Sequence, residues 1–242
     1  KVKLQQFTPA RIQAFVDLSA VLLSRFNAGL KQRREAARRQ GGPVPPAAEL
    51  VDADLARQME VAVAHDIMLS RPLRLSNLKG IRLDDIRFDA DARAVIMIPA
   101  ARVKGRSVRD GDLQVPLSAQ KTRLLRRFIK AGRPRLLAPG GDANPYLFPA
   151  RTSTDAPYSR LGEALVATVH AHVGVLIHPH LYRHLVGWIW LKADPNKLPA
   201  VQRLLGHRRI ETTLKFYAEL DEDLALQEWN DHVESRQNGA TA

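Results

Sequence analysis

The stretch from His180 to Tyr217 constrains this chain more than any other. If the segment around His180 is helical, His180 and Arg183 lie three positions apart and project from one face. Gly206 interrupts an apolar run, which predicts a helix C-terminus there and places His207 in the loop that follows. An imidazole beside an arginine fork suits phosphate oxygens. The spacing therefore indicates a phosphate-binding site with a phenol downstream.

The order His-x-x-Arg, Leu-Gly-His, Thr-Thr and Tyr resembles the C-terminal catalytic domain of the tyrosine recombinases, or phage-type integrases. The resemblance implies that Tyr217 is the nucleophile and that DNA strands are cleaved and rejoined through a 3′-phosphotyrosyl bond. Arg183 and His207 would bind the phosphate, and His180 is the candidate base. Because that bond conserves energy, the family's reaction needs neither ATP nor metal, and we expect no cofactor.

Arg74 is identified by the same resemblance as the first catalytic arginine. It opens the segment Arg-Leu-Ser-Asn-Leu, which is similar to the family's first arginine segment. Asn77 stands where the family usually has glutamate, and Pro72 replaces its usual glycine region. Without the resemblance, Arg74 would be interpreted as an ordinary surface arginine.

Lys104 lies in a basic loop between two predicted strands, where family members carry a catalytic lysine. That lysine would act as the general acid that protonates the departing 5′ oxygen. A lysine in a basic loop is also consistent with a plain phosphate contact.

Two further details depart from the family pattern. Tyr217 follows His207 by ten positions, where nine is more usual, and Phe216 occupies the usual position. Tyr182 stands where leucine is common in the His-x-x-Arg motif, and we expect it to be a packing residue.

Each motif residue also has a structural interpretation. Tyr217 could be an ordinary helix tyrosine, His207 could cap the preceding helix, and His180 with Arg183 could form a surface network. His178, His180 and His184 cluster as zinc ligands do, but Leu181 occupies the place of a zinc protease's glutamate. We therefore predict no metal site.

The charge of the chain favours a polyanionic partner. Its 242 residues carry a net charge of +12 and no cysteine, which is compatible with a reducing compartment. Residues 1–40 hold nine Lys or Arg against two acidic residues, whereas residues 219–234 hold seven acidic residues and no Lys or Arg. No apolar run approaches the roughly 20 residues of a membrane span. Because the chain begins with Lys1, we expect a fragment of a longer protein.

Hydrophobic periodicity predicts a mainly α fold with a small three-stranded antiparallel β-sheet, an α+β arrangement similar to the tyrosine recombinase catalytic domain. The predicted strands are 85–88, 95–98 and 113–116. The first predicted helix starts at Thr8, follows an apolar stripe to Leu30 and continues through the basic run 31–39. The other predicted helices are 52–70, 74–81, 118–131, 157–172, 180–191 and one that ends at Gly206. Lys121 is predicted on the exposed face of the helix 118–131.

The predicted organisation has four parts. Residues 1–40 form a basic helical segment, the end of an upstream DNA-binding region or a linker helix, and residues 41–50 form a linker. Residues 51–235 form the catalytic domain with a C-terminal helix, and 236–242 a tail. The basic run 31–39 is either a solvated helix end or a phosphate-contacting arm, and both remain open. The candidate DNA-binding residues are Arg102, Arg106, Arg33 and Arg34.

The leading hypothesis is a site-specific recombinase or integrase of a mobile genetic element, acting on double-stranded DNA. The resemblance implies a cytoplasmic protein, bacterial or phage-encoded and nucleoid-associated, that self-associates as a tetramer on DNA without a membrane partner. The acidic stretch 221–233 could dock on a neighbouring subunit or pack on its own domain. The alternatives are a catalytically inactive DNA-binding relative and a monomeric type IB-like topoisomerase.

Overall fold

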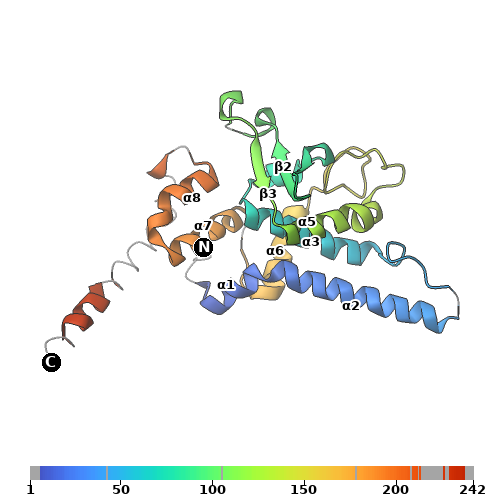
Figure 1. Ribbon diagram of the computed structural model, residues 1–242, viewed down its shortest axis with the longest axis horizontal. Coiled ribbons are helices and arrows are strands. Elements are labelled where there is room, and N and C mark those ends of the chain that lie inside the picture. Colours follow the sequence, from blue (N-terminus) through green and yellow to red (C-terminus); the bar gives the residue numbers. More distant parts are fainter. Residues whose placement is uncertain are drawn as a thin grey trace. The chain divides into compact units, whose positions relative to one another are not determined.

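The computed structural model describes residues 6–41, 43–104, 106–177, 179–207, 209–211, 213, 226 and 229–237 (Figure 1). The chain divides into two compact units, Lys1–Tyr182 and Arg183–Ala242. The first unit holds α1 to α6, the three strands and the first turn of α7, and the second holds the rest of α7 and α8.

Two helices form the N-terminal part of the first unit, α1 (Pro9–Val16) and α2 (Leu18–Arg39). Thr8 caps α1, since its hydroxyl accepts from the backbone nitrogen of Arg11 at 3.4 Å. A single helix was predicted, and the break at Asp17 is a difference: the backbone there has φ −82° and ψ −3°, which ends α1 and starts α2. Of the predicted apolar stripe, Phe15, Leu22, Phe26 and Leu30 are buried, whereas Val16 is 40% exposed. Leu18, outside the predicted stripe, is buried as well.

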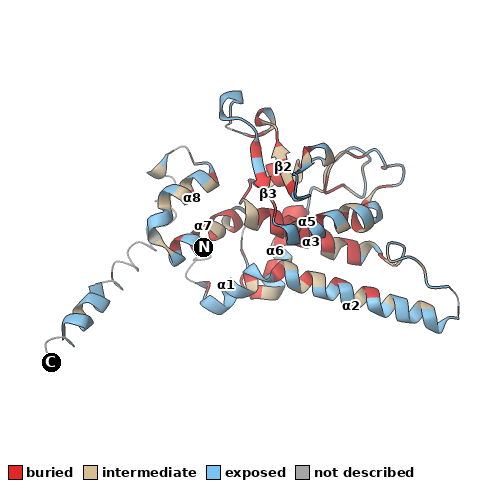
Figure 2. Ribbon diagram, viewed as in Figure 1, coloured by how far each residue is buried: buried red, intermediate tan, exposed pale blue. Residues whose placement is uncertain are grey.

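The helix α3 (Ala53–Ser70) is the centre of the first unit. It starts where predicted, because the Asp52 carboxylate accepts from the backbone nitrogen of Leu55 at 2.9 Å. Helices α2, α5 and α6 all contact it, and α2 runs alongside it in Figure 1. Most of α3 is buried, as Figure 2 shows, including three polar residues that the apolar stripe did not predict, Glu60, His65 and Asp66.

The predicted three-stranded antiparallel sheet is confirmed, with strands β1 (Ile86–Phe88), β2 (Ala94–Ile98) and β3 (Leu113–Pro116). Their order is β1-β2-β3, and Ile96 lies opposite both Ile86 and Val115. Alternate residues of β2 are buried, as expected for a sheet with one face on the core. The sheet displays the loop between β2 and β3 away from that core.

The helix α5 (Ala119–Arg127) continues into a π-helical turn, Phe128–Gly132. Lys121 was predicted on its exposed face, and this is wrong. Its Nζ donates to the backbone oxygen of Asp66 at 3.2 Å and to the Ser70 hydroxyl at 2.9 Å, so the side chain is half-buried and bridges α5 to α3. Burial lowers the pKa of Lys121.

Three further helices follow, α4 (Leu75–Lys79) after α3, α6 (Leu161–Val173) and α7 (Pro179–Ala193). The predicted start of α6 near Pro157 is four residues early, because Pro157 pairs with Pro149 in an isolated β-bridge. Gly174 ends α6 with a φ of 75°, which glycine adopts readily. The helix α8 (Leu198–Leu205) follows α7 in the second unit.

Residues 1–40 belong to the first compact unit, in which α2 packs along α3. The predicted division into residues 1–40, 41–50, 51–235 and 236–242 stays a prediction. Whether residues 1–40 are the end of an upstream DNA-binding region stays a prediction. Among the helices that the structure describes, none combines the length and hydropathy that a membrane crossing requires.

Glu60 supplies a test of the buried polar part of α3. It is fully buried, and one carboxylate oxygen pairs with the guanidinium of Arg57, which also lies 4.0 Å from the centre of the Tyr158 ring. Burial raises the pKa of Glu60 to about 7, and the nearby Arg57 charge offsets part of that effect.

We predict that Glu60→Gln makes folding stability less dependent on pH between about 4.5 and 7. The folded chain keeps this proton after the unfolded chain has lost it, so wild-type stability falls as pH rises through that interval, by on the order of 2–3 kcal/mol. Urea unfolding at pH 5 and pH 7.5 measures the difference. Glu163→Gln, on the exposed face of α6, is the control. An unchanged pH dependence in Glu60→Gln would contradict the burial argument.

Candidate active site

Arg74 lies at the junction between α3 and α4. Pro72 restricts the residue before it to extended backbone, and Arg71 accordingly has φ −151° and ψ 118°, which ends α3. Arg74 then occupies the N-cap position of α4 with an exposed side chain. Its Nη1 donates to the backbone oxygen of Lys104 at 3.0 Å. The structure thus brings together two candidate catalytic residues that are thirty positions apart in the chain.

Lys104 is exposed in the loop between β2 and β3. The far side of this loop is fixed by Arg106, whose guanidinium donates to the backbone oxygens of Gly111 at 2.6 Å and Asp110 at 2.7 Å. Asp110 also accepts from the backbone nitrogen of Ser107 at 2.7 Å. The loop that carries Lys104 is therefore held by several local hydrogen bonds.

Arg71 is a further cation beside this hairpin that the sequence interpretation missed. Its Nη1 donates to the backbone oxygen of Gln114 on β3 at 3.0 Å. Burial lowers its pKa, and the positive charge of Arg106 lowers it further. The only sequence signal was its place three residues before Arg74. Three arginines therefore donate to carbonyl oxygens of one hairpin, Arg71, Arg74 and Arg106.

Besides Arg106, two other candidate DNA-binding residues have internal partners. Arg102 forms an ion pair with the buried Asp85 and donates to the backbone oxygen of Gly80 at 3.2 Å. Arg33 pairs with Asp52, the residue that caps α3. A phosphate contact by either side chain would require these bonds to be exchanged.

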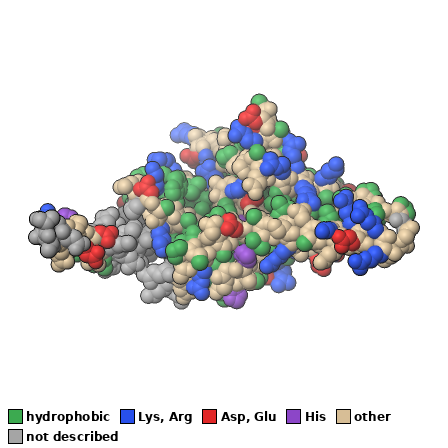
Figure 3. Space-filling model, turned by 60° about the horizontal axis from the view of Figure 1, so that its bottom comes forward, with side chains coloured by type: hydrophobic (Ala, Val, Ile, Leu, Met, Phe, Trp, Pro, Cys, Tyr) green, Lys and Arg blue, Asp and Glu red, His purple; other side chains and the backbone are tan. Residues whose placement is uncertain are grey.

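Arg34 is exposed near the C-terminal end of α2. Figure 3 shows Lys and Arg side chains gathered there, and the exposed ones are Lys31, Arg34, Arg38 and Arg39. DNA contact by Arg33, Arg34, Arg102 and Arg106 stays a prediction.

The motif residues of α7 differ in exposure. His180 is exposed in the first turn, whereas Arg183, one turn further along, is 6% exposed. The predicted helix is confirmed over this motif, so the two residues do lie three positions apart on one helix. His184 follows and is buried.

His207 is held firmly within the second unit. Gly206 ends α8 with φ 62° and ψ 37°, the left-handed conformation expected of a C-terminal glycine. The backbone nitrogen of His207 donates to the Gln202 oxygen at 3.1 Å, and the Gln202 side chain donates back to the His207 oxygen at 3.2 Å. The ring nitrogen Nδ1 lies 2.9 Å from the buried Thr213 hydroxyl, and the His184 ring is 5.7 Å away.

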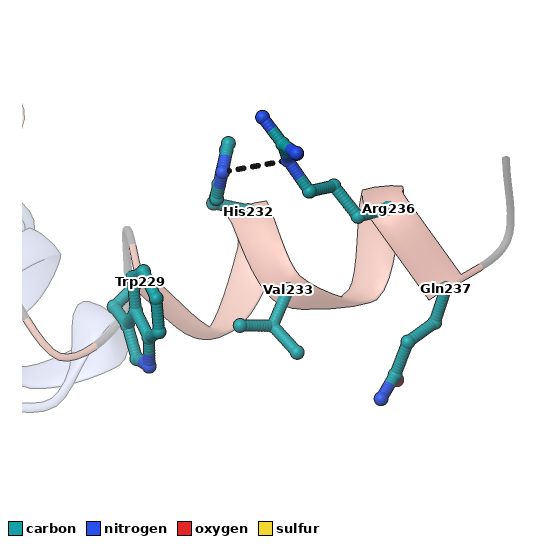
Figure 4. Close-up of a pocket in the computed structure, with 5 residues that line it drawn as sticks. All are labelled: Trp229, His232, Val233, Arg236 and Gln237. Carbon is teal, nitrogen blue, oxygen red and sulfur yellow. Dashed lines mark hydrogen bonds between the residues drawn. The ribbon is translucent and has the colours of Figure 1, made fainter. Parts of the chain in front are cut away.

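Tyr217, the candidate nucleophile, lies outside the described residues, as does His178. Ile210, Glu211 and Thr213, which precede it in the sequence, are helical. In the C-terminal region that contains the acidic stretch, the structure describes Leu226 and residues 229–237, and residues 229–237 form a helical segment. Its surface hollow is lined by Trp229, His232, Val233, Arg236 and Gln237, none of them a candidate catalytic residue (Figure 4).

Residues 47–223 match the family model described as "Phage integrase family", which covers the whole run from Arg74 to Tyr217. The chain belongs to the phage integrase family. Among curated relatives of this phage integrase chain, tyrosine recombinase XerC of Pseudomonas savastanoi pv. phaseolicola is 29% identical over 72% of the chain and 53% of its own length. Tyrosine recombinase XerD of Brucella suis is 30% identical over 63% of the chain and 46% of its own length.

The same fold is found in solved structures. A post-cleavage complex of the XerH site-specific recombinase bound to palindromic difH substrate has a TM-score of 0.53 and 18% identity, covering 84% of this chain and 52% of that one. A pre-cleavage complex gives a TM-score of 0.51. The predicted fold class is thus confirmed for this phage integrase chain, which spans about half the length of the curated relatives it matches.

We predict that Gly206→Ala destabilises the region around His207 by about 1 kcal/mol, because a left-handed backbone is strained for residues with a Cβ. Apart from its chain neighbours, no described residue has an atom within 4 Å of the added Cβ, so the cost is one of backbone conformation. Gly206→Asn should cost less, since asparagine tolerates this conformation. Amide hydrogen exchange at the end of α8 measures both. Equal protection in all three proteins would show that the left-handed turn is not required.

Proposed function

We propose that this chain is the catalytic part of a site-specific tyrosine recombinase or integrase, which cleaves and rejoins DNA strands through Tyr217. The observation that carries the proposal is the hydrogen bond from Arg74 to the backbone of Lys104, which joins two motif positions far apart in sequence. Family membership over residues 47–223 supports it, as do the names of the relatives, tyrosine recombinases XerC and XerD.

In the proposed step, the phenolic oxygen of Tyr217 attacks phosphorus and its proton passes to His180. A phosphotyrosyl bond forms while the bond to the 5′ oxygen breaks, and Lys104 supplies the proton that this oxygen needs as it leaves. Reversal by an incoming 5′ hydroxyl rejoins the strand. The atoms and charges of this step balance without a nucleotide or a metal ion.

The cations stabilise the charge that develops on the non-bridging oxygens. We assign this role to Arg74 and Arg183, with a hydrogen bond from His207. The many bonds that hold His207 support a preorganised donor, because a fixed group loses little freedom when the transition state forms. The hydrogen bond from Arg74 to the Lys104 carbonyl likewise supports the proposal that this guanidinium is positioned before DNA binds.

The proposed partner is double-stranded DNA, in keeping with the net charge of +12. The XerH neighbours are named as complexes with difH substrate. We further propose that the chain assembles as a tetramer on DNA through its C-terminal helix, where Leu226 and Trp229 are 56% and 62% exposed. A bacterial or phage-encoded recombinase of a mobile element would act in the cytoplasm, at the nucleoid.

One observation favours an inactive DNA-binding relative instead. Asn77, at the family's usual glutamate position, is only 6% exposed, so an amide replaces a carboxylate in the interior beside Arg74. A monomeric type IB-like topoisomerase would share the chemistry and would relax supercoils without strand exchange. Covalent trapping on DNA distinguishes the recombinase from the inactive relative, which would form no adduct. A plasmid relaxation assay distinguishes it from the topoisomerase.

We predict that the wild-type chain forms a covalent adduct with a nicked duplex, from which the short fragment that carries the freed 5′ hydroxyl diffuses away. Tyr217→Phe should form no adduct. Phenylalanine lacks the attacking oxygen, while DNA affinity should stay within about twofold. Denaturing gels measure the adduct, and peptide mass spectrometry locates the modified residue. Tyr158→Phe is the control, since its ring can still stack on Arg57. An adduct on another tyrosine would overturn the assignment of the nucleophile.

We predict that Lys104→Ala lowers the rate of adduct formation by about 10²–10³-fold with a natural phosphodiester. A substrate with sulfur in place of the bridging 5′ oxygen should restore most of that rate, because a thiolate leaves without a proton. Arg74→Ala should be slow with both substrates, since the charge on the non-bridging oxygens is unchanged. Equal losses for Lys104→Ala on both substrates would show that Lys104 is a phosphate contact and not the acid.

A further inference from the structure

Tyr182 sits inside the His-x-x-Arg motif, between His180 and Arg183, and its side chain is turned away from solvent. It is 2% exposed and ranks among the largest fully buried side chains. Its hydroxyl forms a hydrogen bond with Nδ1 of His65 on α3, a residue with no exposed surface. The expectation that Tyr182 packs is met, but the packing includes a buried polar bond.

The two rings belong to a cluster of three that joins α1, α3 and the first turn of α7. The Phe15 ring lies 5.0 Å from the His65 ring and 5.0 Å from the Tyr182 ring, and the last two are 5.8 Å apart. The His65 ring meets the other two edge-to-face, at 76° and 81°, a favoured arrangement, and the Phe15 and Tyr182 rings are tilted by 60°. All three residues lie in the first compact unit, of which Tyr182 is the last residue.

Both polar members of the cluster are neutral. Burial lowers the pKa of His65 to about 3 and raises the pKa of Tyr182 well above its ordinary value. Their hydrogen bond is therefore one between uncharged groups across the whole physiological range. It is directional, whereas ring packing alone permits small rotations and slides.

We propose that His65 is a positioning residue: by bonding to Tyr182 it fixes the rotation of the first turn of α7 and so aims His180 and Arg183. Since a helix is rigid, a rotation at Tyr182 is passed directly to its neighbours two positions before and one after. Misplacing a catalytic group by about 1 Å can cost about 10²-fold in rate. This inference rests on the function proposed above.

The test compares Tyr182→Phe, His65→Leu and the double variant. Each single change leaves one buried polar group unpaired and should lower the melting temperature by several degrees, whereas the double change removes both groups and should restore most of it. The rate of adduct formation on the nicked duplex is measured at saturating protein, together with the DNA dissociation constant. Tyr146→Phe, which loses the same hydroxyl elsewhere in the first unit, is the matched control.

A positioning role predicts that Tyr182→Phe reacts about tenfold more slowly with its DNA affinity within twofold of wild type. The double variant should stay about as slow as either single variant, although its melting temperature recovers. If the rate recovers together with the melting temperature, or if Tyr182→Phe reacts at the wild-type rate, the pair is merely structural and the proposal is overturned.

Failure of the two proposals would look different. A wild-type chain that forms no adduct refutes the proposed function, and the positioning role with it. A wild-type chain that reacts while Tyr182→Phe matches it refutes the positioning role alone. Hydrogen exchange of the α7 amides in the absence of DNA adds a readout that does not depend on the reaction. These amides should exchange faster in Tyr182→Phe than in wild type, and Tyr146→Phe should match wild type. Equal rates in all three proteins would refute the positioning role.

Discussion

The hydrogen bond from Arg74 to the backbone oxygen of Lys104 connects the start of α4 to the hairpin between β2 and β3. The proposed chemistry depends on it, because it joins a candidate phosphate clamp to a candidate general acid. Carbonyl oxygens of the hairpin accept from Arg74, Arg71 and Arg106, and their partial negative charge attracts the three guanidinium groups. A hairpin built in this way presents positive charge before any anion is bound, as preorganised electrostatic catalysis requires.

The central helix α3 contacts α4 and β3, the elements on either side of this hydrogen bond. The buried side chain of His65 links α3 to Tyr182 of α7, whereas buried Glu60 pairs with Arg57 within α3 itself. The backbone of Asp66 accepts from Lys121 of α5. Buried polar groups are costly unless paired, so each link restricts α3 to one register against its neighbours. A helix with an entirely apolar surface would pack as tightly but would specify the rotation of the first turn of α7 less sharply.

The sequence predicted what depends on local patterns. Alternating residues located the strands, and the caps at Thr8 and Asp52 and the glycine at position 206 located helix ends. It missed what depends on contacts between distant elements. No periodicity distinguishes Lys121, which bridges to α3, from the exposed arginines beside it. The internal ion pair of Arg102 and the carbonyl contact of Arg71 were equally invisible, since their partners lie on other elements.

The motif order identified the candidate site through family resemblance, but the residues alone left each position with a structural alternative. The most direct measurement is a structure of the chain on DNA with vanadate in place of the scissile phosphate. We predict that Arg74, Arg183 and His207 all donate to oxygens of that one group, with Tyr217 in line for attack. Guanidinium groups of Arg74 and Arg183 bound to different phosphates would contradict it.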